Sequence, residues 1–143
     1  MWPRRLVVAS IAVLVFWAVA TLVAVQAGWP AEFGGLGDPN DVSGEWAVRG
    51  TLVSPPLAPM IAQALLTLLV LVDRRPALGL AGLGLAALGA LYVIGGLGEP
   101  LEPARSDPPA GLYWALKGVG VFGGLALVVT GVETVAAAIR NRL

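Results

Sequence analysis

The sequence predicts an all-α membrane protein whose four transmembrane helices form an up-down bundle with a longer first extracytoplasmic loop. Composition is the first observation. Of the 143 residues, 57% are hydrophobic and 13% are charged, whereas a typical soluble domain carries roughly 25% charged residues. The second observation is a set of four apolar stretches close to the ~20 residues that a bilayer-crossing helix needs. The third is the distribution of charge, which changes sign from one connection to the next.

The four expected spans make a single membrane domain of residues 1–143. The spans and their connections are, in chain order, 6–27, an outer loop at 28–54, 55–72, an inner loop at 73–76, 77–98, an outer loop at 99–111 and 112–134. Ser54 is the expected N-cap of the second span, because a serine side chain accepts a hydrogen bond from the first turn of a helix. The first span also resembles a secretory signal sequence, in which basic residues precede an apolar run and small residues precede the cleavage point. Cleavage would leave three spans.

The charge distribution predicts the orientation in the membrane. The N-terminal flank, the 73–76 loop and the C-terminal end carry six arginines and one aspartate, a net charge of +5. The two outer loops carry seven acidic residues and two arginines, a net charge of −5. Because basic residues favour the cytoplasmic side, we expect both termini in the cytoplasm. The eight arginines against one lysine, with the richness in Ala, Gly and Pro, indicate a bacterial genome of high GC content, so we expect the bacterial cytoplasmic (inner) membrane.

The chain contains no cysteine and no histidine. The common protein ligands of zinc, haem and iron–sulfur clusters are therefore missing, and so is histidine acid–base chemistry. The sequence contains no P-loop, HExxH motif or comparable catalytic motif. Its basic residues are too few and too divided for a nucleic-acid surface. We expect no enzymatic activity, no metal site, no cofactor and no nucleic-acid partner.

The first outer loop contains the run SGEWAVRGTLVSPP, in which charged and aromatic residues precede a Pro-Pro turn. We expect a short helix there, with Asp41 or Ser43 at its N-cap and Gly50 at its end. In such a helix Glu45 and Arg49 form an i,i+4 ion pair. Two interpretations are open. The pair fastens the loop to the helix ends, or it faces a ligand, with Arg49 as the anion-binding group.

Polar residues within the spans are few, so each is a candidate for packing or for function. Gln63 and Thr67 share one helix face, either as interhelical hydrogen-bonding groups or as one wall of a ligand site that also includes Tyr92. Lys117 lies about one turn inside the outer end of the fourth span. It either extends its amine outward or pairs with an outer carboxylate such as Glu99.

Glu133 is the intramembrane charge candidate. If the fourth span covers residues 111–132, this carboxylate lies at the inner interface. If the span covers residues 119–139, the carboxylate is buried and becomes a candidate for proton or cation coupling.

Small residues recur along the third span at steps of three and four. They are Gly79, Gly82, Ala86, Gly89, Val93 and Gly96. The fourth span contains Gly120 and Gly124 in a GxxxG pattern. Small residues let helix backbones approach closely, so we expect these positions at a helix-packing interface. A tight bundle, a dimer interface and a glycine-lined ligand cavity all fit this pattern.

These observations favour a small non-enzymatic integral membrane protein with a structural or accessory role. It would act through helix packing with itself or with a partner, so the expected partners are the lipid bilayer, a second copy or another membrane protein. The alternative is a small transporter or ligand-binding membrane protein with an outward-opening polar cavity. The residues expected at that cavity are Gln63, Tyr92, Lys117, Glu45, Arg49 and Glu99.

Overall fold

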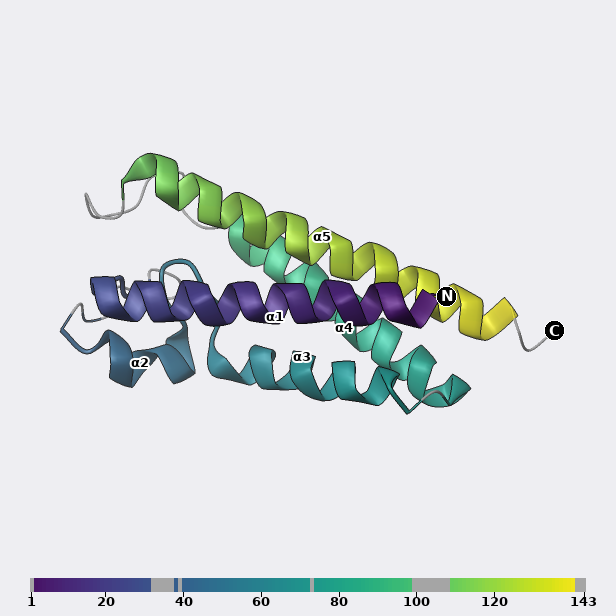
Figure 1. The fold of residues 1–143 in the computed structure, drawn as a ribbon. Coiled ribbons are helices and arrows are strands. Elements are labelled where there is room, and N and C mark those ends of the chain that lie inside the picture. Colours follow the sequence, from purple (N-terminus) through teal and green to yellow (C-terminus); the bar gives the residue numbers. More distant parts are fainter. Residues whose placement is uncertain (1, 32–37, 39, 73, 99–108, 141–143) are drawn as a thin grey trace.

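The computed structural model describes residues 2–31, 38, 40–72, 74–98 and 109–140. Its elements are α1 Trp2–Ala27, α2 Val42–Arg49, α3 Leu57–Val70, α4 Arg75–Gly98 and α5 Ala110–Arg140 (Figure 1). No strand occurs among the described residues. The prediction of an all-α chain is therefore confirmed.

The four longer helices pack as a ring in which each helix contacts two neighbours. α1 lies against α3 and α5, α4 lies against the same two helices, and the α1–α4 diagonal is the weakest contact. Neighbours run antiparallel: Gly120 meets Trp17, whereas Gly123, further along α5, meets Val13, nearer the start of α1. Both termini therefore lie at one end of the bundle and α2 lies at the other (Figure 1). We call these the terminal end and the α2 end.

Three helices are long and apolar enough to cross a membrane, namely α1 over Pro3–Ala27, α4 and α5. The fourth apolar helix, α3, has only 14 residues, which is roughly 21 Å at 1.5 Å per residue. The hydrocarbon core of a bilayer is about 30 Å thick. The stretch expected to span at 55–72 is thus helical over a shorter range than predicted.

The start of α3 also differs from the expected one. Pro56, not Ser54, occupies the N-cap position, and no side chain caps the helix. The Ser54 hydroxyl instead lies 2.9 Å from Thr21 Oγ1 of α1 and 2.7 Å from Thr51 Oγ1. Pro56 has an extended backbone, with φ −57° and ψ 163°, and a residue that precedes proline is disfavoured from the α region, so the helix begins after the two prolines. The serine is left to tie the preceding loop to α1.

The core has two hydrophobic layers. Residues buried toward the terminal end are Leu6, Val70, Ala81 and Leu85. Residues buried toward the α2 end include Val13, Trp17, Ala20, Ala24, Tyr92 and Tyr113. Buried Ser10, Gln63 and Thr67 lie between these layers along α1 and α3. These three residues form a polar layer in the middle of the bundle.

α4 and α5 form the most extensive helix contact, and glycines determine its geometry. A Cβ added to Gly89 would lie 2.5 Å from the Gly124 carbonyl oxygen, and one added to Gly124 would lie 2.7 Å from the Gly89 carbonyl oxygen. Gly82 and Gly131 form a second reciprocal pair, with distances of 2.9 Å and 2.5 Å. Backbones this close make Cα–H···O contacts and exclude larger side chains.

Of the remaining small residues of the third span, three lie at this interface and one faces open space. Ala86 and Val93 pack on the two α5 glycines of the reciprocal pairs, and Gly96 faces Val121. Gly79 does not belong to the interface, because a Cβ placed there would meet nothing within 4 Å. The physical reason is the angle between the helices: α4 diverges from α5 toward the terminal end, where Gly79 lies (Figure 1).

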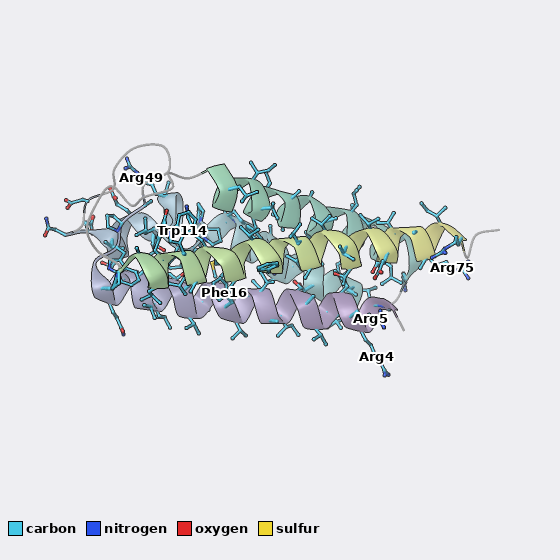
Figure 2. All side chains as sticks on the ribbon, turned by 90° about the horizontal axis from the view of Figure 1, so that it is seen from above. Arg4, Arg5, Phe16, Arg49, Arg75 and Trp114 are labelled. Carbon is cyan, nitrogen blue, oxygen red and sulfur yellow. The ribbon has the colours of Figure 1, made fainter. Side chains whose placement is uncertain are left out.

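Arginine side chains lie at both ends of the bundle. Arg4, Arg5 and Arg75 lie at the terminal end, whereas Arg49 and Trp114 lie at the opposite end (Figure 2).

The α2 end carries the short helix α2, which follows Asp41 and ends before Gly50. No side chain caps α2 at its start. The helix expected in the first outer loop is therefore present, without a capping hydrogen bond.

Candidate functional site

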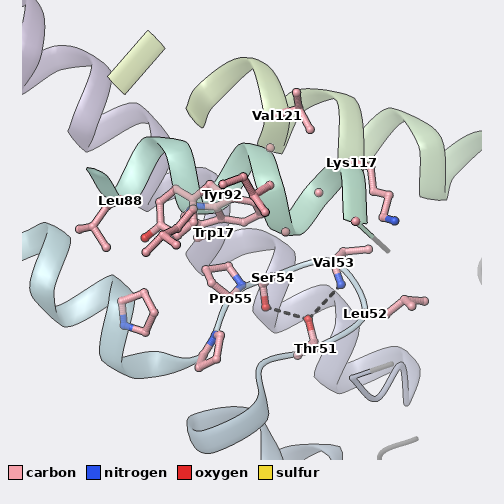
Figure 3. Close-up of a pocket in the computed structure, with 18 of the residues that line it drawn as sticks. Trp17, Thr51, Leu52, Val53, Ser54, Pro55, Leu88, Tyr92, Lys117 and Val121 are labelled. Atoms are coloured by element: carbon pink, nitrogen blue, oxygen red, sulfur yellow. Dashed lines mark hydrogen bonds between the residues drawn. The ribbon is translucent and has the colours of Figure 1, made fainter. Parts of the chain in front are cut away.

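A cavity of about 410 Å³ lies at the α2 end of the bundle, where α3 and α4 diverge (Figures 1 and 3). Its volume falls within the ~300–1,000 Å³ typical of small-molecule sites. α4 and α5 form one wall. The connection from α2 to α3 and the first turn of α3 form the opposite wall, and one residue of α1, Trp17, closes the space between them.

The wall formed by the α2–α3 connection is fixed by its backbone. Gly50 has φ 80°, a left-handed conformation that other residues adopt only with strain. A Cβ there would also lie 2.6 Å from the Ser54 carbonyl oxygen. Beyond it, the Thr51 amide donates to that same carbonyl at 3.0 Å, and the Val53 amide donates to Thr51 Oγ1 at 3.3 Å. This wall is a closed turn rather than a loose loop.

Two aromatic side chains line the middle of the cavity. The rings of Trp17 and Tyr92 meet edge to face, with 5.4 Å between their centroids, a favourable arrangement for aromatic pairs. The far edge of the indole contacts Gly120, where an added Cβ would lie 2.5 Å from Trp17 Cη2. Trp17 is 6% exposed. Its Nε1 is buried and has no hydrogen-bond partner among the described residues.

Basic side chains mark one end of the cavity. Lys117 and Leu88 lie at opposite ends, with the two aromatic rings between them (Figure 3). Lys117 is 7% exposed. Its amine lies 4.6 Å from the centroid of the Tyr113 ring, within cation–π range. Arg49 also lines the cavity, and its Nη1 lies 3.9 Å from Glu45 Oε1. Positive charge is therefore concentrated at the α2 end of an otherwise apolar space.

One side of the cavity is made of residues that also face outward. Leu91 and Ile94 line it and are 61% and 66% exposed. Gly95 and Gly98 lie on the same helix and line the cavity, and an added Cβ at either would meet nothing within 4 Å. Because these outward positions lie on an apolar helix, the cavity opens sideways.

The structure gathers part of the ligand site that the sequence predicted. Tyr92, Lys117 and Arg49 all line the cavity. Glu45 is not among the lining residues. Its carboxylate contacts Arg49 and accepts a hydrogen bond from the Asp38 amide at 3.0 Å. The remaining predicted residue, Glu99, lies outside the described residues.

Gln63 lies next to the predicted site but does not line the cavity. Its Nε2 donates to the carbonyl oxygen and to Oγ of Ser10, at 3.0 and 3.1 Å, and its Oε1 accepts from the Tyr92 hydroxyl at 3.0 Å. Thr67 Oγ1 donates to the Gln63 carbonyl at 2.7 Å, so Ser10 Oγ is the donor in its 2.6 Å bond to Thr67 Oγ1. Every amide and hydroxyl group in this network has a partner, which is expected of interhelical packing.

Glu133 lies near the terminal end of α5 and is half-buried. The next residue, Thr134, packs against Gly82, which is in the second turn of α4. α5 continues past the N-terminus of α1 (Figure 1). Among the described residues, no group of three His, Cys, Asp or Glu side chains is placed to hold a metal ion.

Among the lining residues that sequence reasoning did not place at the cavity are Trp17, Thr51 and Gly95. Trp17 lies in the middle of an unbroken apolar run, where nothing distinguishes it from a lipid-facing residue. Thr51 follows Gly50, and a threonine after an expected helix end was a usable signal for a fixed turn. Gly95 belongs to the same glycine-rich helix as the packing glycines, and only the position of α5 separates the two groups.

Comparisons of this chain with protein-family models, with curated proteins and with solved structures find no significant match.

Proposed function

We propose that this chain is a non-enzymatic membrane protein that binds an amphipathic small molecule in the cavity between α3 and α4. The cavity itself carries the proposal: it has the volume of a small-molecule site, an apolar interior and a basic end. The glycine seam adds indirect support. Close packing of Gly82, Gly89, Gly124 and Gly131 occurs within this chain, so those glycines are not available as a dimer interface.

A structural or accessory protein that packs against itself or a partner is the second candidate. The short helix α3 favours it. At 14 residues, α3 leaves a hydrophobic mismatch of roughly 9 Å with a 30 Å hydrocarbon core. Oligomerisation is one way in which a membrane protein relieves such a mismatch, and local thinning of the bilayer is another.

We further propose that all four apolar helices cross the bacterial inner membrane, with both termini in the cytoplasm and the α2 end outside. The support is the opposite net charge of the two sets of connections and the positive-inside rule. In this placement Glu133 lies near the inner interface rather than at mid-membrane. α1 supplies core residues and the Ser10 bonds to α3, so we propose that it is retained rather than cleaved.

The chain has no cysteine, so single cysteines test this topology without background. We expect Ser43→Cys to react with a membrane-impermeant maleimide in intact spheroplasts, and Arg140→Cys to react only after permeabilisation. The reverse pattern would invert the topology. Reaction of both in intact spheroplasts would mean an odd number of spans.

The binding proposal is tested by native mass spectrometry of the gently extracted full chain. We expect a bound small molecule at one per chain. Gly95→Leu fills the cavity from a position with free space and should abolish binding. Gly79→Leu is the matched control, because it is the same change on the same helix at an equally open position outside the cavity. Equal loss or equal retention in the two variants would contradict the proposal.

A further inference from the structure

We propose that the occupant of this cavity is an anionic phospholipid of the outer leaflet, with one acyl chain inside the cavity and its phosphate at the basic end. This inference rests on the proposed function and on the orientation proposed with it. Three features of the cavity carry it: its side opening, its polarity along the bundle and the charge at its mouth.

The side opening points to a ligand that arrives from the bilayer. Leu91 and Ile94 line the cavity and are also among the most exposed residues of α4. On a membrane-spanning helix, apolar positions with that exposure face lipid tails. A lipid tail can therefore pass into the cavity between these two side chains and the first turn of α3. A water-soluble ligand would have no use for this route.

The interior changes from apolar to polar along α4, as a lipid does along its length. From Leu88 to Gly98 the cavity follows α4 for roughly 15 Å at 1.5 Å per residue, with Leu88 at the apolar end and Lys117 at the polar end (Figure 3). Trp17 packs on Gly120, about one helical turn, or roughly 5 Å, below Lys117. The ester carbonyls of a phospholipid lie below its phosphate, so they reach the level of Trp17, which lines the cavity.

The charge at the mouth selects an anionic head group. The two outer connections have a net charge of −5, yet Arg49 and Lys117, both at the α2 end, line the cavity. Arg49 pairs with Glu45 only at 3.9 Å. A guanidinium has five N–H donors, so this pairing leaves donors for a phosphate, which arginine binds with charge-assisted hydrogen bonds.

The test uses the full chain in lipid nanodiscs that contain equal amounts of phosphatidylglycerol and phosphatidylcholine, released for native mass spectrometry. We expect phosphatidylglycerol to be retained over phosphatidylcholine by about tenfold, the effect of one hydrogen bond to a charged group. Arg49→Gln should bring the ratio close to one. Arg140→Gln, at the other end of the bundle, is the matched control and should leave the ratio unchanged.

The position of the acyl chain is tested by tryptophan fluorescence with brominated acyl chains, which quench at contact. The signal of Trp17 is the difference between the wild type and Trp17→Phe. We expect brominated phosphatidylglycerol to quench this signal, Gly95→Leu to prevent the quenching and Gly79→Leu to leave it intact. Quenching that Gly95→Leu does not change would come from lipids around the protein, and it would overturn the proposal.

The outcomes separate this inference from the proposed function. Equal retention of the two lipids, or equal effects of Arg49→Gln and Arg140→Gln, overturns the anionic lipid. A non-lipid molecule that is bound by the wild type and lost in Gly95→Leu also overturns the lipid, while the proposed function stands. Absence of any bound molecule from the wild type overturns both.

Discussion

The two sides of α4 use the same kinds of residue to opposite effect. Toward α5, glycines bring two backbones together until a Cβ would meet a carbonyl oxygen at 2.5 Å, as at Gly89. On the side that faces α3, near the α2 end of the bundle, Gly95 and Gly98 border an open space of about 410 Å³. A glycine in a membrane helix therefore gives close contact where another backbone faces it and free volume where none does.

Different forces hold the neighbouring helices together on the two sides of α4. Lipid tails are as apolar as leucine, so burial of apolar surface does not drive helices together inside a bilayer. On the α5 side, close backbone packing supplies the attraction through dispersion and Cα–H···O contacts. On the α3 side, the Gln63 network supplies it through hydrogen bonds. We expect the α5 side to tolerate no added atoms. We expect the stability of the α3 side to depend on a few polar groups.

The largest expected effect comes from Gly89→Ala. Its methyl group would lie against the Gly124 carbonyl, and a backbone cannot yield as a side chain can, so α4 and α5 must separate. Overpacking of a core costs about 1–3 kcal/mol, and we expect a loss of unfolding free energy of about 3 kcal/mol. The measurement is reversible unfolding in mixed micelles.

Gly79→Ala is the control for this change, because its methyl group meets no atom within 4 Å. We expect it to leave the free energy of unfolding unchanged or to raise it by up to about 1 kcal/mol, since alanine is a better helix former than glycine. A loss in Gly79→Ala similar to that in Gly89→Ala would show that contact with α5 does not set the cost, and the contrast between the two sides of α4 would disappear.

Much of the fold follows from the sequence because its signals are long. Apolar runs of more than 20 residues predict α1, α4 and α5, and a three- and four-residue spacing predicts the interface at Gly82 and Gly89. The length of α3 does not follow, because the apolar run continues at both ends beyond the helix, which begins after Pro56 and ends at Val70. Gly79 fits the spacing but not the interface, since spacing carries no information about the angle between helices.

The cavity is less accessible to sequence reasoning than the fold. Tyr92, Lys117 and Arg49 could be selected because polar groups are rare in this chain, and rarity is visible in a sequence. Gln63 was selected for the same reason, yet its amide is consumed by Ser10 and Tyr92. Whether a polar side chain faces a cavity or a partner depends on neighbours that are distant in the chain, and composition does not contain them.

An intermediate effect is expected on the α3 side from Gln63→Leu. The change removes the acceptor of the Tyr92 hydroxyl and the donor to Ser10, and both groups stay buried. Interhelical hydrogen bonds in membranes contribute about 0.6 kcal/mol on average and up to ~1.7, so we expect a loss of about 1–2 kcal/mol in the same unfolding experiment. The lipid retained by Gln63→Leu should equal that of the wild type, because Gln63 does not line the cavity.

Tyr92→Phe makes this prediction more specific. It removes the hydroxyl that Gln63→Leu leaves without an acceptor. The double variant should therefore lose less unfolding free energy than the two single variants lose together. The coupling expected between residues in one hydrogen-bonded network is about 0.5–1 kcal/mol. Strictly additive losses would mean that the bond between Tyr92 and Gln63 contributes nothing to the α3 side.

The smallest effect concerns the attachment of α2, next to the cavity. Glu45 accepts the Asp38 amide hydrogen bond at 3.0 Å, whereas its contact with Arg49 is 3.9 Å long. Glu45→Ala should therefore speed hydrogen exchange at the Asp38 amide about three- to tenfold, the effect of losing a hydrogen bond of about 1 kcal/mol. Arg49→Ala should leave that exchange rate unchanged, because exposed ion pairs are worth about 0–1 kcal/mol. If both variants accelerate exchange equally, the ion pair rather than the Asp38 bond fixes α2, and Arg49 is then a fastening residue that is not free to bind an anion.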